Sequence, residues 1–448
     1  MKDKSFNKEL FALAIPFALQ GLLNALVGAS DALMLGRLTQ ESISAVSLAN
    51  EITFILSLFT GAVLGGAGTL VAQYFGKGDN ETVKKLLSMA LRYVTGLSFI
   101  FFALTFFIPD KLMMIFTNEP ELIRIGASYL RIVGFSYLFS GIAQCYMMLM
   151  RVDGRLKTVV WISAVTVVVD MVVDFFLIYG KAGVPALGAD GSAYSTIVVE
   201  IMAMIWVIVS SYGKDRVRPS GKSLVTIIPV LEKDMIKIAT PMLASGLLWG
   251  LSMSAHASII GHLGIDATAA YAVLNVALGL IQCVSHGFAS GSGVMLGKLL
   301  GANELEKAKE YGRKFWTVSI WCGFANMGLL AIVGPLVYFF YVLEPGAKQY
   351  LIYMILYNLL YMFAYSFNTI FTCGVLPSGG DARYDAESVF VATWCFALPI
   401  SAIGCFVFHW PVMVVYMVMC ADEIVKFPFL IPRYKKYYWL NNLTRENV

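Results

Sequence analysis

Two aspartates in an otherwise apolar stretch are the residues of this sequence best suited to chemistry. Asp170 and Asp174 stand in the segment VVDMVVDFF, where every other side chain is apolar. A spacing of four residues puts both carboxylates on one face of a helix. Two carboxylates held together in a low-dielectric setting repel, so either one keeps a proton or a cation lies between them. Both outcomes suit an ion-binding site, and a structural pair held by neighbouring hydroxyls or water is the alternative.

A third acid, Asp31, lies in an earlier apolar stretch, after Pro16. Ionisable groups inside a bilayer are costly, and they commonly mark ion or substrate pathways. We therefore predict that Asp31, Asp170 and Asp174 form a site that couples transport to a proton or a cation, and that they are the ligands if the ion is Na⁺. Lone polar residues in apolar stretches are weaker candidates for the same pathway, with structural roles as the alternative: Asn50, Glu51, Glu200, His256 and His286.

Other chemistries lack the residues that they need. The nearest approach to a nucleotide-binding loop is GSGVMLGKL at 291–299, where the spacing is wrong and no Ser or Thr follows Lys298. The net charge of +4 is small and its basic residues are dispersed, unlike a nucleic-acid-binding surface. We expect no enzymatic activity, no nucleotide or nucleic-acid partner and no cofactor, with H⁺ or Na⁺ as the coupling ion. Aromatic and Met side chains could line a cavity for an organic cation through cation–π contacts: Tyr137, Trp249 and Met253.

The elements that position these residues are predicted to be membrane-spanning helices. Hydrophobic residues make up 58% of the chain and charged residues 14%, whereas a soluble domain carries about a quarter charged residues. The apolar excess must face lipid, and one span needs about 20 apolar residues. The sequence therefore predicts an all-α polytopic membrane protein of twelve spans, at about 10–35, 43–75, 88–109, 122–150, 157–180, 190–212, 235–261, 267–300, 314–341, 347–376, 387–408 and 411–432.

Basic residues in the connections predict the orientation of the spans. One alternate set of connections holds most of the Lys and Arg, and the other set holds only Arg37, Lys111, Lys181 and Lys348. By the positive-inside rule the basic set is cytoplasmic, so both termini are predicted to lie in the cytoplasm of a multi-pass protein of the cell membrane. The largest polar stretch, at about 213–234, reads as a cytoplasmic linker.

The two halves of the chain repeat one another at a shift of 225 residues. Pro16 then meets Pro241 and Gly36 meets Gly261, and further matches follow at Asn50 with Asn275 and at Glu119-Pro120 with Glu344-Pro345. Six spans per copy is an even number, so the copies run parallel, and two such lobes can rock about a central cleft. We predict lobes at 1–218 and 219–448, with Pro16 and Pro241 as hinges because proline kinks a helix.

The copies differ where charge lies. The shift carries Asp31 onto His256, while Asp170 and Asp174 have only the apolar Phe396 and Ile400 opposite them one residue later in register. Ion coupling is therefore predicted to lie mainly in the N-terminal copy.

Several short segments, taken in their order and spacing, resemble the multidrug and toxic compound extrusion (MATE) family, within a wider flippase-related superfamily. They span nearly the whole chain: ASDALMLGRL, SLANEITF, AQYFGKGD, DFFLIYG…PALGADGSAYST, GKLLGANELEKAKEYGRKF, LPSGGDAR and ADEIVKF. The resemblance implies twelve helices in two six-helix lobes around a V-shaped cleft. It also implies rocker-switch export of amphipathic organic cations, drugs or metabolites in exchange for H⁺ or Na⁺.

The resemblance assigns roles to individual residues. Its first-span acid corresponds to Asp31, and its fifth-span motif, commonly Asn-x-x-x-Asp, corresponds to Asp170 and Asp174. Its sixth-span hydroxyl corresponds to Thr196, or less closely to Ser192. A seventh-span Glu used by another branch has no counterpart in SGLLWGLSMS, which favours coupling in the N-terminal lobe. A metabolite or lipid-precursor flippase of the same superfamily and a non-transporting membrane receptor or scaffold remain the alternatives.

Overall fold

The structure is a computed structural model that describes residues 4–181, 183, 185–213, 217, 219, 224, 226–341 and 343–446. Every regular element in this part of the chain is a helix, which confirms the predicted all-α fold. Eleven helices among the described residues are long and apolar enough to cross a membrane. Much of the predicted linker, including 214–216 and 220–223, lies outside the described residues.

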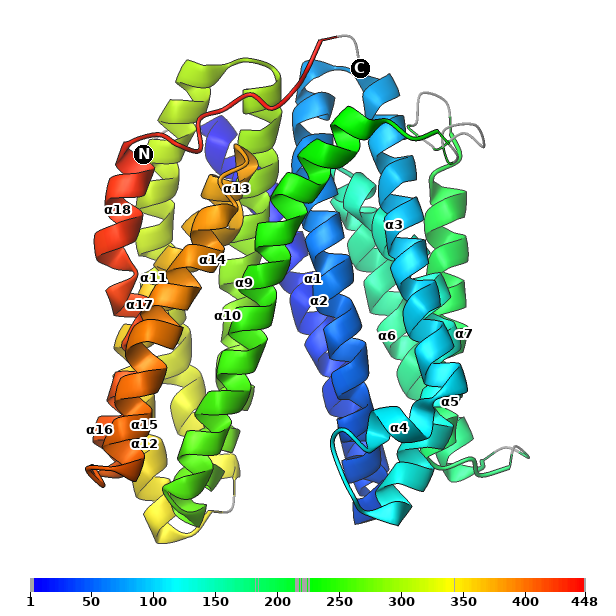
Figure 1. The fold of residues 1–448 in the computed structure, drawn as a ribbon, viewed down its shortest axis with the longest axis vertical. Helices are drawn as coiled ribbons and strands as arrows, with labels where there is room; N and C mark the ends of the chain where they lie inside the picture. Colours follow the sequence, from blue (N-terminus) through cyan, green and yellow to red (C-terminus); the bar gives the residue numbers. More distant parts are fainter. Residues whose placement is uncertain are drawn as a thin grey trace. The chain divides into compact units, whose positions relative to one another are not determined.

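By their contacts the residues form two compact units, and Figure 1 shows each as a bundle of long helices lying alongside one another. Unit 2 consists mainly of Gln20–Ala239. Its helices are the second part of α1 (Lys4–Gly36), α2 (Gln40–Lys77), α3 (Asn80–Phe107), α4 (Pro109–Met113), α5 (Pro120–Val152), α6 (Leu156–Tyr179), α7 (Ala189–Ser210) and the start of α9 (Pro229–His262).

Short capping signals separate the long helices of unit 2. The Thr39 hydroxyl accepts a hydrogen bond from the backbone N–H of Ser42 at the start of α2, and the Asp79 carboxylate accepts one from Thr82 at the start of α3. Gly78 ends α2 in the left-handed conformation with φ of 81°, which glycine adopts without steric cost. The turn between α2 and α3 is therefore specified locally.

Unit 1 consists of Met1–Leu19 and Thr240–Arg445. Its long helices are the rest of α9, α10 (Ile265–Gly301), α11 (Leu305–Phe340) and α12 (Pro345–Ile370). Shorter pieces follow: the π-helix η1 (Phe371–Val375), α13 (Leu376–Ser378), α14 (Arg383–Val389), the π-helix η2 (Phe390–Ala397), α15 (Leu398–Phe406), α16 (Val412–Met419), α17 (Asp422–Val425) and α18 (Phe427–Lys435).

The last three predicted spans are thus interrupted, and the twelfth, at 411–432, is divided among α16, α17 and α18. Prolines explain part of this pattern, since a proline has no N–H to donate to the preceding turn. Pro377, Pro399 and Pro428 each lie in the first turn of a short helix that follows a π-helix or a break. The twelve-span architecture stands. The tenth and eleventh spans, Pro345–Ser378 and Arg383–Phe406, are still among the eleven helices that could cross a membrane, and only the twelfth is divided into pieces too short to be counted.

The first helix of each half contributes to both units. Helix α1 belongs to unit 1 as far as Leu19 and to unit 2 from Gln20, close after Pro16. Helix α9 changes unit between Ala239 and Thr240, next to Pro241. The boundaries of the two contact-based units do not coincide with those of the two sequence repeats. The lobes predicted at 1–218 and 219–448 therefore remain a prediction.

Gly287 of α10 lets the first part of α1 approach closely in unit 1. A Cβ atom at this position would lie 2.6 Å from the carbonyl oxygen of Ala14 and 2.7 Å from the Cβ of Ala18. Gly279 is on the same helix and has nothing within 4 Å of such an atom. The difference between the two glycines makes a matched test.

We expect Gly287→Leu to destabilise the protein by about 1–3 kcal/mol, because the added side chain overpacks the α1–α10 contact. Gly279→Leu should leave stability nearly unchanged, since its side chain enters open space. Thermal unfolding of the purified variants in detergent measures both effects. Equal midpoints for the two variants would show that the close approach of α1 and α10 contributes nothing to stability.

Candidate functional site

The structure brings Asp31, Asp170 and Asp174 together within unit 2. One carboxylate oxygen from each of the three lies within 4.8 Å of the others. Asp170 and Asp174 come from α6, and Asp31 from the second part of α1. Asp170 is 4% exposed and Asp174 is fully buried, whereas Asp31 is half-buried. We call these three residues the aspartate cluster.

The aspartate cluster holds more acceptor oxygens than donors. Both carboxylate oxygens of Asp174 and Oδ1 of Asp31 are buried and find no hydrogen-bond donor among the described residues. Three negative charges this close repel strongly unless a proton or a cation enters between them. Carboxylate oxygens are the ligands that hard cations prefer, so the residues fit either a shared proton or a bound Na⁺.

Helix α7 supplies the hydroxyl that contacts the cluster. Ser195 Oγ donates a hydrogen bond of 2.8 Å to Oδ1 of Asp170. Thr196, the residue indicated by the family resemblance, donates instead to the backbone carbonyl of Ser192 on its own helix, and Ser192 Oγ is buried with no hydrogen-bond partner among the described residues. Sequence reasoning therefore missed Ser195 as the contacting hydroxyl.

Gly191 explains why Ser195 reaches the cluster. A Cβ atom on Gly191 would lie 2.8 Å from the backbone of Leu177, so the glycine lets α7 pack directly against α6. Ser195 is one turn further along α7 and fully buried, and it faces α6 for that reason. A glycine followed by a serine four residues later was the available signal in the sequence.

We expect Ser195→Ala to change the apparent affinity for the coupling ion about tenfold, because a hydrogen bond to a charged group contributes about 1.5–3 kcal/mol and its loss disfavours the ionised carboxylate of Asp170. Thr196→Val should change it less, since that hydroxyl bonds only to its own helix. Substrate efflux from proteoliposomes as a function of ion concentration measures both. A larger effect from Thr196→Val would show that the wrong hydroxyl has been assigned.

The remaining candidates of unit 2 fall into two groups. Tyr137 is buried, and its hydroxyl lies 2.9 Å from the Thr53 hydroxyl, while Asn50 accepts a hydrogen bond from Tyr129 at 3.3 Å. These contacts join α5 to α2. Glu51 is exposed and Glu200 is half-buried, and neither contributes an oxygen to the aspartate cluster.

The candidates of unit 1 also differ in their surroundings. His256 is 5% exposed, and its Nε2 has no hydrogen-bond partner among the described residues. His286 Nε2 lies 3.0 Å from the Tyr365 hydroxyl, which links α10 to α12. Trp249 is exposed and Met253 half-buried on α9.

Comparison with known proteins assigns both halves of the repeat to the same family. The MatE family model matches the chain twice, at residues 16–176 and 241–403, beginning at the paired prolines. The chain is 27% identical to the "Probable multidrug resistance protein YoeA" of Bacillus subtilis over 327 residues, covering 71% of this chain and 69% of that one. It is 20% identical to the "Uncharacterized transporter YisQ" of the same organism over 441 residues, covering 98% and 96%.

Solved structures agree on the fold. A point mutant of the Vibrio cholerae MATE transporter VcmN superposes with a TM-score of 0.88 at 17% identity, over 96% of this chain and 97% of that one. An outward-facing multidrug resistance MATE family transporter of the MOP superfamily gives a TM-score of 0.86 at 16% identity, over 96% of both chains. Since the family model matches more than half of the chain, in two copies, the protein belongs to the MATE family of multi-pass membrane transporters.

Proposed function

We propose that the protein is a secondary antiporter that exports amphipathic, cationic organic molecules in exchange for H⁺ or Na⁺ bound at the aspartate cluster. In this proposal the protein lies in the cell membrane with both termini on the cytoplasmic side. The substrate class rests on the relatives, since YoeA is named as a probable multidrug resistance protein. No nucleotide or other cofactor enters the proposal.

The observation that carries the proposal is the aspartate cluster itself. Three carboxylates from two helices meet in a buried position, and two of them have oxygens with no donor among the described residues. A purely structural cluster would be stabilised by donors, because burying an unpaired charge costs several kcal/mol. An ion that enters and leaves during a transport cycle accounts for the missing donors.

The cluster can act on substrate through α1. Binding of an ion between Asp31 and the α6 aspartates draws the second part of α1 towards α6, and its release lets the two separate. The first part of α1 belongs to unit 1, and Pro16 lies within the helix. A movement of the second part alone would therefore bend α1 at the proline. Ion binding and substrate binding would thereby exclude one another, as antiport requires.

The test is an efflux assay in proteoliposomes with separately imposed Na⁺ and pH gradients and a panel of organic cations. We expect at least one gradient to drive efflux of organic cations well above the rate seen without a gradient. Transport of lipid precursors but not organic cations would favour the flippase alternative. Absence of any gradient-driven flux from folded, correctly inserted protein would contradict antiport.

A further inference from the structure

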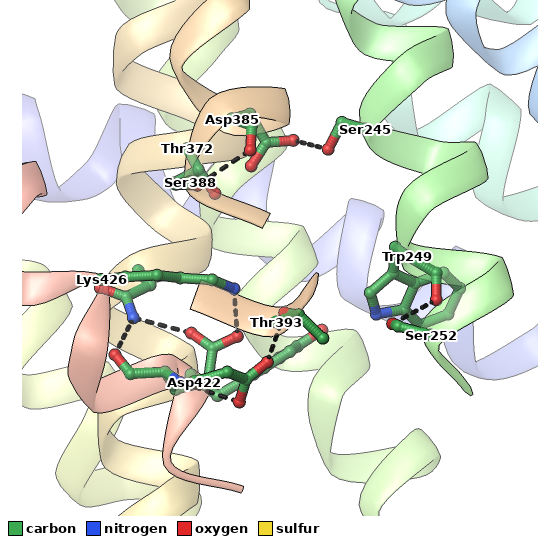
Figure 2. A network of polar contacts seen from close by, with 12 residues as sticks. Ser245, Trp249, Ser252, Thr372, Asp385, Ser388, Thr393, Asp422 and Lys426 are labelled. Atoms are coloured by element: carbon green, nitrogen blue, oxygen red, sulfur yellow. Dashed lines mark hydrogen bonds and ion pairs between the residues drawn. The ribbon is translucent and has the colours of Figure 1, made fainter. Parts of the chain in front are cut away.

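The buried charged residues of unit 1 are held by contacts with one another. Lys426 Nζ donates a hydrogen bond of 2.6 Å to Oε1 of Glu423, and the Thr393 hydroxyl donates one of 3.0 Å to Asp422. Figure 2 shows Asp422 and Lys426 converging in this network. Because these charged groups already have partners within the unit, they give no reason to expect a ligand there.

A charged residue of a different kind lies near the start of α11. Arg313 is exposed, and it forms no ion pair or hydrogen bond among the described residues. Its neighbour Lys314 is engaged, with Nζ 2.6 Å from Oε1 of Glu310 and 5.4 Å from the centre of the Phe6 ring. All four residues line one cavity, so the two basic groups outnumber the single acid at its rim.

This cavity, which we call the α1–α11 groove, has a volume of about 950 Å³ and lies entirely within unit 1. One wall is the first part of α1, with Leu10 and Phe11, and the opposite wall is α11. Phe288 of α10 also lines the groove, and its ring packs edge-on against that of Phe11 with the centres 5.8 Å apart. The groove is therefore a concave apolar space between helices, unlike a convex helix face that lipid merely covers.

The groove changes from polar to apolar along α11. The lining residues nearest the start of the helix carry charges or a hydroxyl, and those further along are apolar: Val318, Trp321, Cys322 and Ala325. Spacings of three and four residues place them on one face of the helix. From Val318 to Ala325 the apolar part extends about 10 Å, roughly two thirds of the hydrocarbon depth of one leaflet. In the predicted orientation the start of α11 is cytoplasmic, so the polar end lies at the level of the inner-leaflet headgroups.

We propose that the α1–α11 groove binds one anionic phospholipid of the cytoplasmic leaflet, with its phosphate on Arg313 and an acyl chain along the apolar part. A guanidinium suits this ligand because its N–H groups match two phosphate oxygens at once. Basic pockets between helices on the cytoplasmic side attract anionic headgroups, whereas the ammonium of a zwitterionic lipid is repelled by Arg313. The acyl chain covers Phe11 and Trp321, whose side chains are 48% and 61% exposed. The site makes no use of the aspartate cluster, so it goes beyond the proposed antiport.

The test is lipid binding to the purified full-length protein in neutral detergent, followed by native mass spectrometry. Dioleoyl phosphatidylglycerol and dioleoyl phosphatidylcholine are titrated in parallel, so only the headgroup differs. We expect the first phosphatidylglycerol to bind at least fivefold more tightly than the first phosphatidylcholine, and Arg313→Gln to reduce this ratio below twofold. Lys157→Gln is the matched control and should keep the wild-type ratio, because Lys157 is an exposed base near the start of α6 that does not line the groove.

Phosphatidylglycerol with brominated acyl chains tests where the lipid binds, since bromine quenches a tryptophan that it contacts. The fluorescence contributed by Trp321, taken as the difference between wild type and Trp321→Phe, should be quenched at a lower lipid concentration than with brominated phosphatidylcholine. Arg313→Gln should abolish this difference, and because Arg313 is exposed its replacement leaves the fold intact.

Three results would overturn the proposal. The first is equal binding of the two lipids to the wild type, and the second is a preference that Arg313→Gln leaves unchanged. The third is displacement of phosphatidylglycerol by an equal concentration of glycerol 1-phosphate, which would reveal an anion site that does not need the acyl chain. The assays use neither an ion gradient nor a transported substrate, so their failure is distinguishable from a failure of the proposed antiport.

Discussion

Asp174→Asn is expected to reduce gradient-driven efflux of organic cations to the rate seen in empty liposomes. The substitution removes the negative charge of the most buried member of the aspartate cluster, whose two oxygens have no donor among the described residues. With that charge gone, the cluster can no longer exchange an ion between buried carboxylates. Efflux from proteoliposomes under imposed Na⁺ and pH gradients measures the loss.

Asp170→Asn is the matched control for this prediction. It stands on the same face of α6, yet the MATE resemblance has Asn at this position, and Ser195 can still donate to the amide oxygen. We expect Asp170→Asn to keep ion-coupled efflux, with a changed preference between H⁺ and Na⁺. Normal coupling in Asp174→Asn, or equal loss in both variants, would show that Asp174 is not the essential ion-binding group.

The second large effect concerns the stability of unit 1. Lys426 Nζ and Glu423 Oε1 form a buried ion pair at 2.6 Å. Lys426→Met is expected to cost about 3–5 kcal/mol, because it leaves Glu423 buried without its counter-charge. Glu423→Gln alone should also destabilise, since it strands the ammonium. The double variant should recover much of the loss, because it removes both charges and keeps a side-chain acceptor for Asn368, whose Nδ2 donates to Oε2 of Glu423 at 2.7 Å.

A double-mutant cycle in chemical or thermal unfolding, with purified protein in detergent, measures the coupling between Lys426 and Glu423. Additive single effects, with no recovery in the double variant, would mean that the two charges do not stabilise one another.

The sequence was sufficient for the architecture and for the aspartate cluster. Apolar runs of span length predict the helices, and the spacing of Asp170 and Asp174 places them on one helix face. The breaks in the last spans were not predicted, because hydropathy measures how apolar a run is and not whether its backbone stays α-helical. Pro399 lies inside the predicted span at 387–408, and Pro377 directly follows the predicted span at 347–376.

Two features depend on packing that a single sequence does not specify. Whether Ser195 or Thr196 faces α6 depends on the rotation of α7, which the close contact at Gly191 determines. The segment ADEIVKF lies within the predicted span at 411–432, where the sequence marks it only as part of the family resemblance. Its burial against Thr393 and Asn368 needs the tertiary structure.

The most direct test of the account is ion release on substrate binding. Purified protein in a weakly buffered solution is mixed with a transported organic cation, while a pH electrode and bound radioactive Na⁺ are followed. The account predicts that substrate displaces H⁺ or Na⁺ from the wild-type protein and that this release is lost in Asp174→Asn. Substrate binding without ion release, or equal release from Asp174→Asn, would contradict coupling through the aspartate cluster.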